Sequence, residues 1–162
     1  MLDNNHTHPE IQFDEGRHWR AKIGYVLLAT EQTISDDVYT LKPTGVGVHF
    51  ARAPIPDSIT NETLLAQADH LAPAAATILP DGSLDVVCYG CTSGSLVIGE
   101  DRVFSELNKG APGAKATSLI TGVLRALRTV GAHKIVVATP YLDEINQAEA
   151  IYMRKAGFDI LS

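Results

Sequence analysis

The chain has 162 residues, of which 45% are apolar and 20% are charged, and this size and balance predict one soluble globular domain. Its net charge of −6, with no run of Lys or Arg, argues against a nucleic-acid partner. The longest uncharged apolar run, 23-IGYVLLAT-30, is too short to span a membrane, the polar N-terminus is not typical of a secretory signal, and two cysteines favour a reducing, cytoplasmic setting.

The first half of the chain predicts strands and helices in alternation, after a flexible lead-in over residues 1–20. Apolar or alternating runs indicate the strands, and helical spacing of apolar residues indicates the helices. In chain order we expect a strand over 23–29, a helix over 34–41, a strand over 45–52 and a helix from about residue 60. Pro73 is expected to break or restart that last helix.

The second half continues the same alternation. In chain order we expect a strand over 84–90, a helical segment over 96–107 that Gly99 divides, an amphipathic helix over 115–130, a strand over 134–139, a helix over 143–156 and the start of a strand over 158–161. Because the chain stops on that nascent strand, we expect the α/β domain of residues 21–162 to be the first half of a two-domain protein.

The predicted fold class is α/β. Strands made of nearly continuous Val, Ile and Leu, separated by helices, are typical of a parallel sheet that helices cover on both faces. We expect four to five strands in a three-layer domain of the flavodoxin-like or Rossmann-like kind. The sequence has neither a Walker A loop nor a complete G-x-G-x-x-G motif, so a nucleotide site of either standard type has little support.

Both cysteines fall within 88-CYGCTSGS-95, which follows a predicted strand. Cys88 is expected inside the strand as a small buried apolar residue, and Cys91 in the loop beyond it. A thiol between a strand and a helix lies near backbone N–H groups, which favour the nucleophilic thiolate. Thr92 and Ser93 add hydroxyl donors, so the loop combines a candidate nucleophile with groups that suit a carboxylate.

Two other interpretations of the cysteine pair remain open at this point. C-Y-G-C has the spacing of a dithiol redox motif, although here the second cysteine would be the exposed one. It also has the spacing of half a zinc site, but no second C-x-x-C or H-x3–5-H pair completes it, so we expect no metal site. His6 and His8 lie in the lead-in and are expected to be solvated.

Two further loops should meet the cysteine loop, because the carboxyl ends of parallel strands lie at one edge of a sheet. The loop after the first strand offers Thr30 and Gln32, while Glu31 would repel a carboxylate and is expected to face water. The loop after the strand over 134–139 offers Tyr141, whose phenol could donate to a ligand carboxylate. Packing of Tyr141 against the core is an equally good interpretation.

The segments DVVCYGCTSGSLVIGE and KIVVATPYLDEIN together resemble the first half of the aspartate/glutamate racemase superfamily, and within it the maleate cis–trans isomerases and their ectoine-utilisation relatives. The resemblance covers about residues 20–161. It implies two similar α/β domains with the active site in the cleft between them, each domain contributing one cysteine position.

The resemblance also implies roles for individual residues. Cys91 matches the catalytic cysteine of the first domain, Thr92 and Ser93 match groups that hold a substrate carboxylate, and Tyr141 matches a substrate-contacting tyrosine. The arylmalonate decarboxylase branch lacks a cysteine at this first position, so Cys91 argues against that activity. The loop 30-TEQT-33 departs from the Ser/Asn-type segment of maleate isomerases, which puts the exact substrate in doubt.

The function expected from these observations is a cofactor-independent isomerase or racemase for a small carboxylate, most of all a dicarboxylate such as maleate, acting through the Cys91 thiolate. The alternatives are a dithiol redox protein that uses Cys88 and Cys91, and a non-catalytic carboxylate-binding half-domain. Since the opposing cysteine of the implied cleft is absent, we expect a homo-oligomer or a missing C-terminal domain, and little turnover from these 162 residues alone.

Overall fold

The computed structural model describes residues 10–80 and 82–161. The expectation for His6 and His8 therefore lies outside the described residues. Residues 10–20 run without regular structure up to the first strand, and near their end the Trp19 ring lies over Gly45, where an added Cβ would come within 2.5 Å of it. The expected lead-in thus meets the domain at the start of its second strand.

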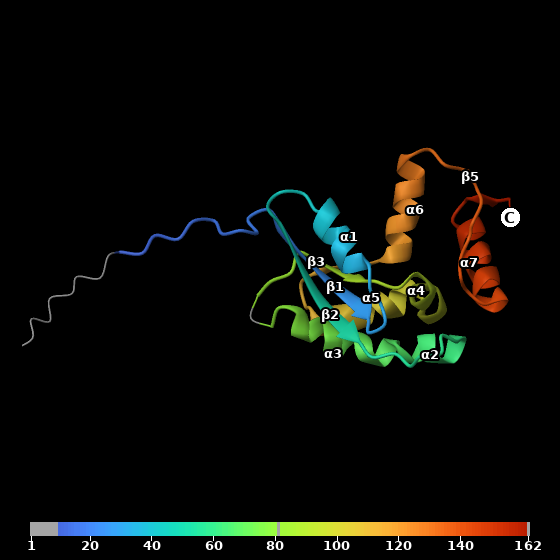
Figure 1. The fold of residues 1–162 in the computed structure, drawn as a ribbon, viewed down its shortest axis with the longest axis horizontal. Helices are drawn as coiled ribbons and strands as arrows, with labels where there is room; N and C mark the ends of the chain where they lie inside the picture. The colour runs from blue at the N-terminus through green and yellow to red at the C-terminus, as the bar shows by residue number, and fades with distance from the viewer. Residues whose placement is uncertain (1–9, 81, 162) are drawn as a thin grey trace, which may run out of the picture.

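Four parallel strands form the main sheet (Figure 1). In spatial order they are β2 (Val46–Ala53), β1 (Ala21–Leu28), β3 (Val86–Tyr89) and β4 (Lys115–Ser118). β1 pairs with β2 over eight residues, from Ala21 opposite Val46 to Leu28 opposite Ala53, and with β3 over four. Since β1 and β3 are the two central strands, their carboxyl ends are where a ligand site is expected.

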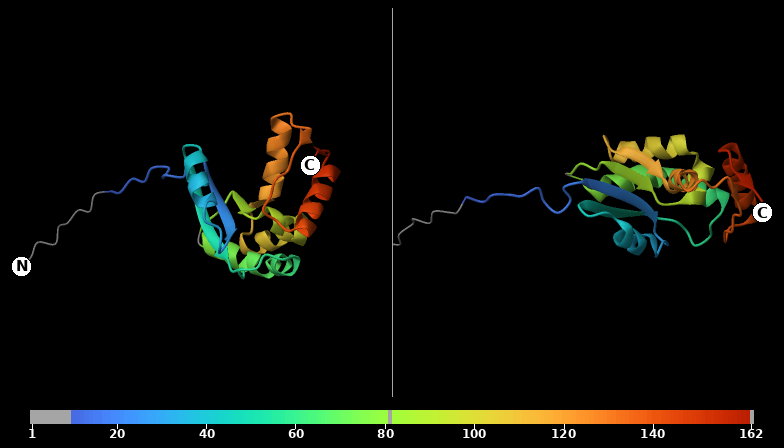
Figure 2. Two further views of the ribbon diagram at one scale, coloured as in Figure 1. Left: turned by 45° about the vertical axis from the view of Figure 1, so that its right-hand side comes forward. Right: turned by 90° about the horizontal axis from the view of Figure 1, so that it is seen from above.

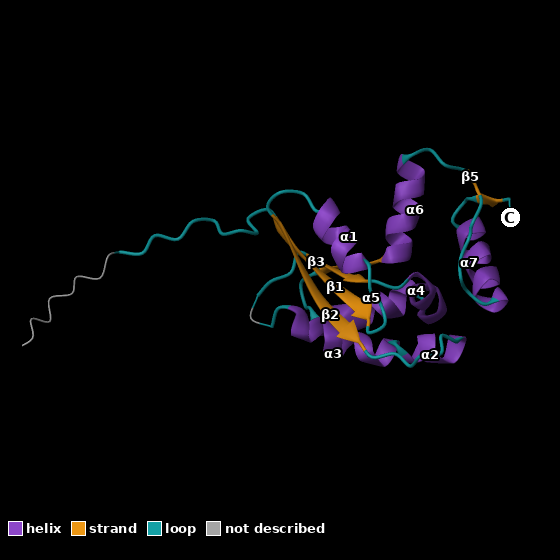
Figure 3. Cartoon of the chain, viewed as in Figure 1, coloured by secondary structure: helices purple, strands orange, loops and turns teal. Residues whose placement is uncertain are grey.

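Helices lie on both faces of this sheet, as expected for the α/β class (Figure 3). α3 (Ala68–Ile78) and α5 (Glu100–Gly110) cover one face, and α2 (Asn61–Ala66) continues that layer beyond the strand ends. Their contacts with the sheet make the larger core, which includes Val26, Val87 and Leu107, all fully buried. α1 (Ile34–Leu41) lies on the opposite face, where Tyr39 packs edge-on against Phe50.

A second, smaller unit follows the main sheet (Figure 2). β5 (Lys134–Ile135) and β6 (Asp159–Ile160) pair in parallel as a separate two-stranded sheet, and α7 (Asp143–Lys155) connects them. α6 (Leu119–Thr129) leads from β4 into this unit, and its buried Ile120 shares a second hydrophobic cluster with Phe158. α7 also contacts α4 (Thr92–Ile98), the helix that follows the cysteine loop.

Glu100 ties the two units together from the first position of α5. Its carboxylate accepts hydrogen bonds from the hydroxyls of Ser118 (2.6 Å), Thr121 and Tyr152. These three donors come from the end of β4, the first turn of α6 and the middle of α7. The half-buried carboxylate of Glu100 therefore connects the main sheet to α6 and α7.

The strand assignment at the far edge of the sheet needs correction. We expected the strand over 134–139 to be the fourth strand, but β4 takes that place, and residues 115–118 were expected to begin a helix. The short segment KATS lacks the apolar run that signals a buried strand, because β4 lies at the edge of the sheet. Only Lys134 and Ile135 of the expected strand pair as such, and they do so in the second sheet.

Two helix boundaries also differ from expectation. α4 begins at Thr92 rather than at Leu96, so most of the expected cysteine loop is the first turn of a helix. Pro73 lies inside α3, and the break in that region falls earlier, at Gln67 between α2 and α3. The expected division at Gly99 is confirmed, because this residue has a φ of 87°, a conformation that glycine adopts readily and that ends α4.

Candidate active site

Cys91 lies at the junction between β3 and α4, at the N-cap of the helix. Its extended backbone (φ −143°, ψ 116°) turns the sulfur back over the first helical turn, where it accepts the backbone N–H of Gly94 at 3.2 Å. The Ser93 hydroxyl lies 3.6 Å from the same sulfur. Donors at a helix start stabilise an anionic sulfur more than a neutral one, so the local geometry suits a thiolate.

Both cysteines are buried, with 6% of Cys88 and 7% of Cys91 exposed, so the expectation that Cys91 would be the exposed cysteine is wrong. The two differ in backbone position, and Cys88 lies inside the strand as expected. It lies within β3, and its neighbours Val87 and Tyr89 both face the larger core, so alternation directs the Cys88 side chain to the other face of the sheet. Burial raises the pKa of the Cys88 thiol to about 12. Both cysteines are free thiols. Because Cys91 belongs to the larger core and Cys88 does not, this arrangement argues against a facile disulfide between them.

This contrast predicts which thiol reacts. Iodoacetamide at neutral pH should modify Cys91 at least about tenfold faster than Cys88, because only the thiolate is nucleophilic. Burial raises the pKa of the Cys88 thiol, whereas the equally buried Cys91 sulfur accepts a backbone N–H at the start of α4. Mass spectrometry with fragment-ion mapping separates the two sites within one peptide. Faster modification of Cys88 would show that the nucleophile has been assigned to the wrong cysteine.

The hydroxyl groups of the motif do not all serve the same purpose. Ser95 is fully buried and its hydroxyl donates to the Cys91 carbonyl oxygen at 2.6 Å, so it stabilises the start of α4. Ser93 is also buried but lies beside the sulfur, and Thr92 is partly exposed at the first position of the helix. Of the two predicted carboxylate-binding residues, Thr92 therefore faces outward and Ser93 lies beside the thiol.

Tyr141 reaches this region although it comes from the second unit. We expected it at the edge of the main sheet, but the contact arises because α7 packs against α4. The Thr139 side chain accepts the backbone N–H of Tyr141, and Asn146 donates to the Tyr141 carbonyl oxygen, so the T-P-Y turn is held at both ends. Burial raises the pKa of the Tyr141 phenol, a hydrogen bond with Ser93 lowers it, and the nearby Cys91 and Glu149 raise it further.

Glu149 is a site neighbour that the sequence pattern did not reveal. It lies on α7, is only 5% exposed, and its Oε2 atom has no hydrogen-bond partner among the described residues. Burial raises the pKa of this carboxyl. In sequence it lies on an ordinary amphipathic helix, but in the structure it lies near the Tyr141 phenol, on a helix that packs against α4.

The buried carboxyl of Glu149 is expected to lower the free energy of unfolding by an amount that depends on pH. Because the pKa of Glu149 is higher in the folded chain than its ordinary value of 4.5, folding favours the protonated form, and the penalty grows as pH rises above 4.5. Glu149→Gln should therefore raise the free energy of unfolding by about 1 kcal/mol at pH 7 and by much less near pH 4. Urea unfolding at the two pH values tests this, with the exposed Glu144→Gln as control. An equal gain at both pH values would contradict it.

The loop after β1 presents Thr30 and Gln32 at the same end of the sheet, and both are exposed. Glu31, which we expected to face water, instead accepts the backbone N–H groups of Thr33 (2.7 Å) and Ile34 (2.8 Å) and so stabilises the start of α1. Burial alone would raise its pKa, but these hydrogen bonds and Arg52 lower it. The Glu31 carboxylate therefore stabilises its own loop through these hydrogen bonds.

A surface hollow lies away from Cys91. It has a volume of about 640 Å³ and lies between α7 and the segment 137–139, where Val137, Gln147 and Ile151 line it. None of the predicted site residues lines it. The predicted site residues Cys91, Ser93 and Tyr141 lie together at the start of α4 and not in this hollow.

Two further classes of site receive no support from the described residues. Residues 10–80 and 82–161 contain no cluster of three or more His, Cys, Asp or Glu side chains placed to hold a metal ion. Among the same residues, no helix has both the length and the apolar character needed to cross a membrane.

Comparison with solved structures shows that this fold is shared. A mutant of the maleate cis–trans isomerase of Nocardia farcinica, with a covalently bound succinylcysteine intermediate, is 22% identical over 87% of this chain, with a TM-score of 0.73. The maleate isomerase Iso of Pseudomonas putida S16 is 18% identical over 86%, with a TM-score of 0.70. Unliganded arylmalonate decarboxylase is 20% identical over 86%, with a TM-score of 0.59.

The match extends over only part of those proteins. It covers 61% of each isomerase chain and 58% of the decarboxylase chain. None of the curated proteins compared with the chain matches it. A family model described as arylmalonate decarboxylase matches residues 51–162, which is more than half of the sequence. The chain therefore belongs to the arylmalonate decarboxylase family, within the aspartate/glutamate racemase superfamily that its cysteine motif resembles.

Proposed function

We propose that this chain carries the first thiol and the carboxylate-binding turn of a cofactor-independent isomerase for a small dicarboxylate such as maleate. The observation that carries the proposal is the convergence of Cys91, Ser93 and Tyr141 at the start of α4. A sulfur that accepts a backbone N–H lies there beside a serine hydroxyl, and the phenol of Tyr141 approaches from the turn before α7. Such a group of donors around one nucleophile suits addition to an electron-poor double bond of a carboxylate substrate.

The proposed reaction begins with the Cys91 thiolate. Its sulfur adds to one carbon of the double bond, the π electrons move toward the other carbon and its carboxylate, and the former double bond becomes a single bond. Rotation about that bond follows, and the electrons then re-form the double bond as the thiolate leaves. The product is the trans isomer, fumarate, and the enzyme regains its thiolate, so the step needs no external oxidant or reductant.

The donors around the sulfur have distinct parts in this proposal. Ser93 and the N–H groups of the first turn of α4 hold one substrate carboxylate, whose charge would otherwise repel the thiolate. Tyr141 donates to the other end of the substrate. Thr92, Thr30 and Gln32 are proposed to contact the substrate from the rim, because all three lie toward solvent at the same end of the sheet.

The solved relatives support a covalent step of this kind. The Nocardia farcinica structure holds a succinylcysteine intermediate, which is a cysteine sulfur bonded to the carbon skeleton that maleate has after addition. Arylmalonate decarboxylase has the same fold, and the family carries its name. Decarboxylation of an arylmalonate is therefore the second candidate, and the presence of Cys91 favours the isomerase over it.

The chain spans 61% of the length of the isomerases that it matches, so the complete activity is itself a proposal. We propose that the wall opposite Cys91 comes either from a second copy of this chain or from a second domain. An unopposed site would admit water and weaken the contacts to the substrate. Little turnover is therefore expected from a single copy of these 162 residues.

The test is an assay for fumarate. The purified chain is incubated with maleate at increasing protein concentration, and fumarate is measured by proton NMR. A specific rate that rises with concentration supports a site completed by a second copy, and a constant specific rate supports a complete site in one copy. Release of carbon dioxide from an arylmalonate, or racemisation of aspartate, without any fumarate from maleate would replace the isomerase by that other activity.

A further inference from the structure

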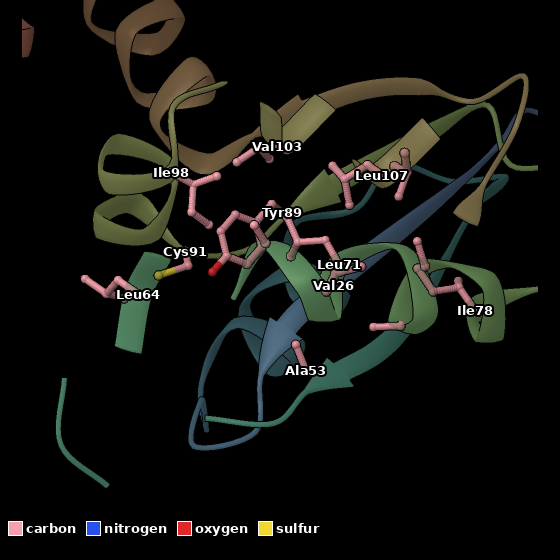
Figure 4. Packing of buried hydrophobic residues seen from close by; sticks show 14 of the residues in the cluster. Val26, Ala53, Leu64, Leu71, Ile78, Tyr89, Cys91, Ile98, Val103 and Leu107 are labelled. Carbon is pink, nitrogen blue, oxygen red and sulfur yellow. The ribbon is translucent and has the colours of Figure 1, made fainter. Parts of the chain in front are cut away.

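Tyr89 is the last residue of β3 and one of the largest fully buried side chains, at 0% exposure. Its ring packs in the larger core, and its hydroxyl reaches the start of α4. Figure 4 shows the phenol oxygen pointing toward the Cys91 sulfur from inside the core. The sulfur thus has a hydroxyl on its buried side as well as the donors of the helical turn.

Gly94 shows how close these groups are. A Cβ atom added at Gly94 would lie 2.5 Å from the Tyr89 phenol oxygen and 3.1 Å from the Cys91 sulfur. Both atoms therefore border the same small space against the helix backbone, and any side chain at this position would push into it. Glycine here leaves room for the phenol to lie beside the thiol.

The Tyr89 hydroxyl lacks another hydrogen-bond acceptor among the described residues. Among the described residues, the Tyr89 oxygen has no partner that meets the full geometry of a hydrogen bond, and it is completely buried. A buried hydroxyl without an acceptor costs free energy, so the neighbouring sulfur is the acceptor that the structure offers. Burial raises the pKa of the phenol, and the nearby Cys91 sulfur raises it further.

We propose that Tyr89 is a positioning residue whose hydroxyl donates a hydrogen bond to the Cys91 thiolate and so holds that sulfur in its reactive form and direction. A hydrogen bond to a charged acceptor is stronger than one to a neutral thiol, so this bond tightens as the thiol loses its proton. The inference deepens the proposed function, but it concerns the thiol itself and is tested without any turnover.

Other groups also face Cys91 and must be kept constant in the test. The phenol of Tyr141 approaches from the turn before α7, with the buried carboxyl of Glu149 behind it. Ser93 and the Gly94 N–H lie on α4 itself. None of these is altered by removing the Tyr89 hydroxyl, so a change in the titration of Cys91 can be assigned to that hydroxyl.

The experiment measures the alkylation rate of Cys91 by iodoacetamide against pH, with fragment-ion mapping, in the wild-type chain, Tyr89→Phe and Tyr25→Phe. Tyr25 is a matched control, because its half-buried ring stacks on Phe50 near the facing Cys88 in the adjacent strand. In Tyr89→Phe we expect an alkylation rate about tenfold lower at neutral pH and a midpoint about one pH unit higher. At high pH its rate should equal or exceed that of the wild type, since nucleophilicity rises with thiol pKa.

Two results in Tyr89→Phe, and one in a labelled chain, would overturn the proposal. An unchanged midpoint in Tyr89→Phe would show that the hydroxyl does not act on the thiolate, and a faster rate at every pH would show that the ring merely shields Cys91. If Tyr89→Phe fails to fold, an NMR experiment answers the same question. The Tyr141→Phe chain is labelled with carbon-13 at the tyrosine ring carbon that bears the hydroxyl, and the tyrosine resonances are followed against pH. One resonance should then shift at the Cys91 midpoint and lose that shift in Cys91→Ala; no such resonance would also overturn the proposal.

Discussion

Maleate should form a covalent adduct with Cys91, and Cys91→Ala should abolish both the adduct and any fumarate formation. The loss should reach roughly a thousandfold or more, because removing a catalytic nucleophile removes the reaction path itself. The adduct forms by addition of the thiolate to the double bond and adds the mass of one maleate to the chain. It should accumulate where the opposite wall of the site is incomplete, since elimination then lacks its partner groups.

Intact-mass spectrometry after incubation with maleate measures the adduct, and fragment ions locate it. Cys88→Ala is the matched control, because it removes the other thiol of the motif. The pKa of the Cys88 thiol is raised to about 12, so this thiol stays protonated at neutral pH. Cys88→Ala should form the adduct at the wild-type rate. An adduct that persists in Cys91→Ala, or that moves to Cys88, would refute the proposed nucleophile.

Much of this arrangement could be predicted from the sequence. The apolar runs at 23–29 and 84–90 and the alternating pattern at 45–52 predicted three strands, and the structure has β1, β3 and β2 there in one parallel sheet. The cysteine motif predicted Cys91 in a loop between a strand and a helix, and the structure places it at the N-cap of α4, because that helix begins at Thr92 and not at Leu96 as expected. The superfamily was predicted from the same motif, and the family match confirms it.

The edge of the sheet was predicted wrongly for a physical reason. An edge strand such as β4 buries little surface, so its four residues carry no apolar run and read as the start of the following helix. The apolar run at 134–139 was expected to be the fourth strand, yet only Lys134 and Ile135 form a strand, and that strand belongs to a second sheet. Hydrophobic pattern shows that a segment will be buried, but it does not show against which neighbour.

The neighbours of the thiol could be predicted only in part. Tyr141 was expected near Cys91 because its loop was expected to follow a strand of the same sheet. The contact between Tyr141 and the Cys91 region instead depends on α7 packing against α4. Tyr89 and Glu149 were not singled out, because a tyrosine in an apolar strand and a glutamate in an amphipathic helix are both ordinary. What distinguishes them is a buried oxygen without a partner, and only side-chain packing reveals that.

Glu100→Gln is expected to weaken the connection between the main sheet and α7. The carboxylate accepts three hydroxyl hydrogen bonds, from Ser118, Thr121 and Tyr152, and a neutral amide accepts them less strongly. We expect the free energy of unfolding to fall by about 2 kcal/mol at pH 7. Asp101→Asn is the matched control, since Asp101 is the next residue in the same helical turn and is exposed.

The effect of Glu100→Gln should depend on pH in a defined direction. Burial alone would raise the pKa of Glu100, but the three hydroxyl donors and Arg125 outweigh it and lower the pKa below its ordinary value of 4.5. The stabilisation is therefore complete above pH 4.5 and is lost as pH falls through the lowered pKa of the folded chain. Urea unfolding at pH 7 and near pH 3 should show a large difference between wild type and variant at pH 7 and a smaller one at low pH. An equal difference at both pH values, or the same loss in Asp101→Asn, would show that Glu100 acts only as part of its helix. Because Tyr152 lies on the helix that positions Tyr141, the variant should also form the maleate adduct more slowly than Asp101→Asn does.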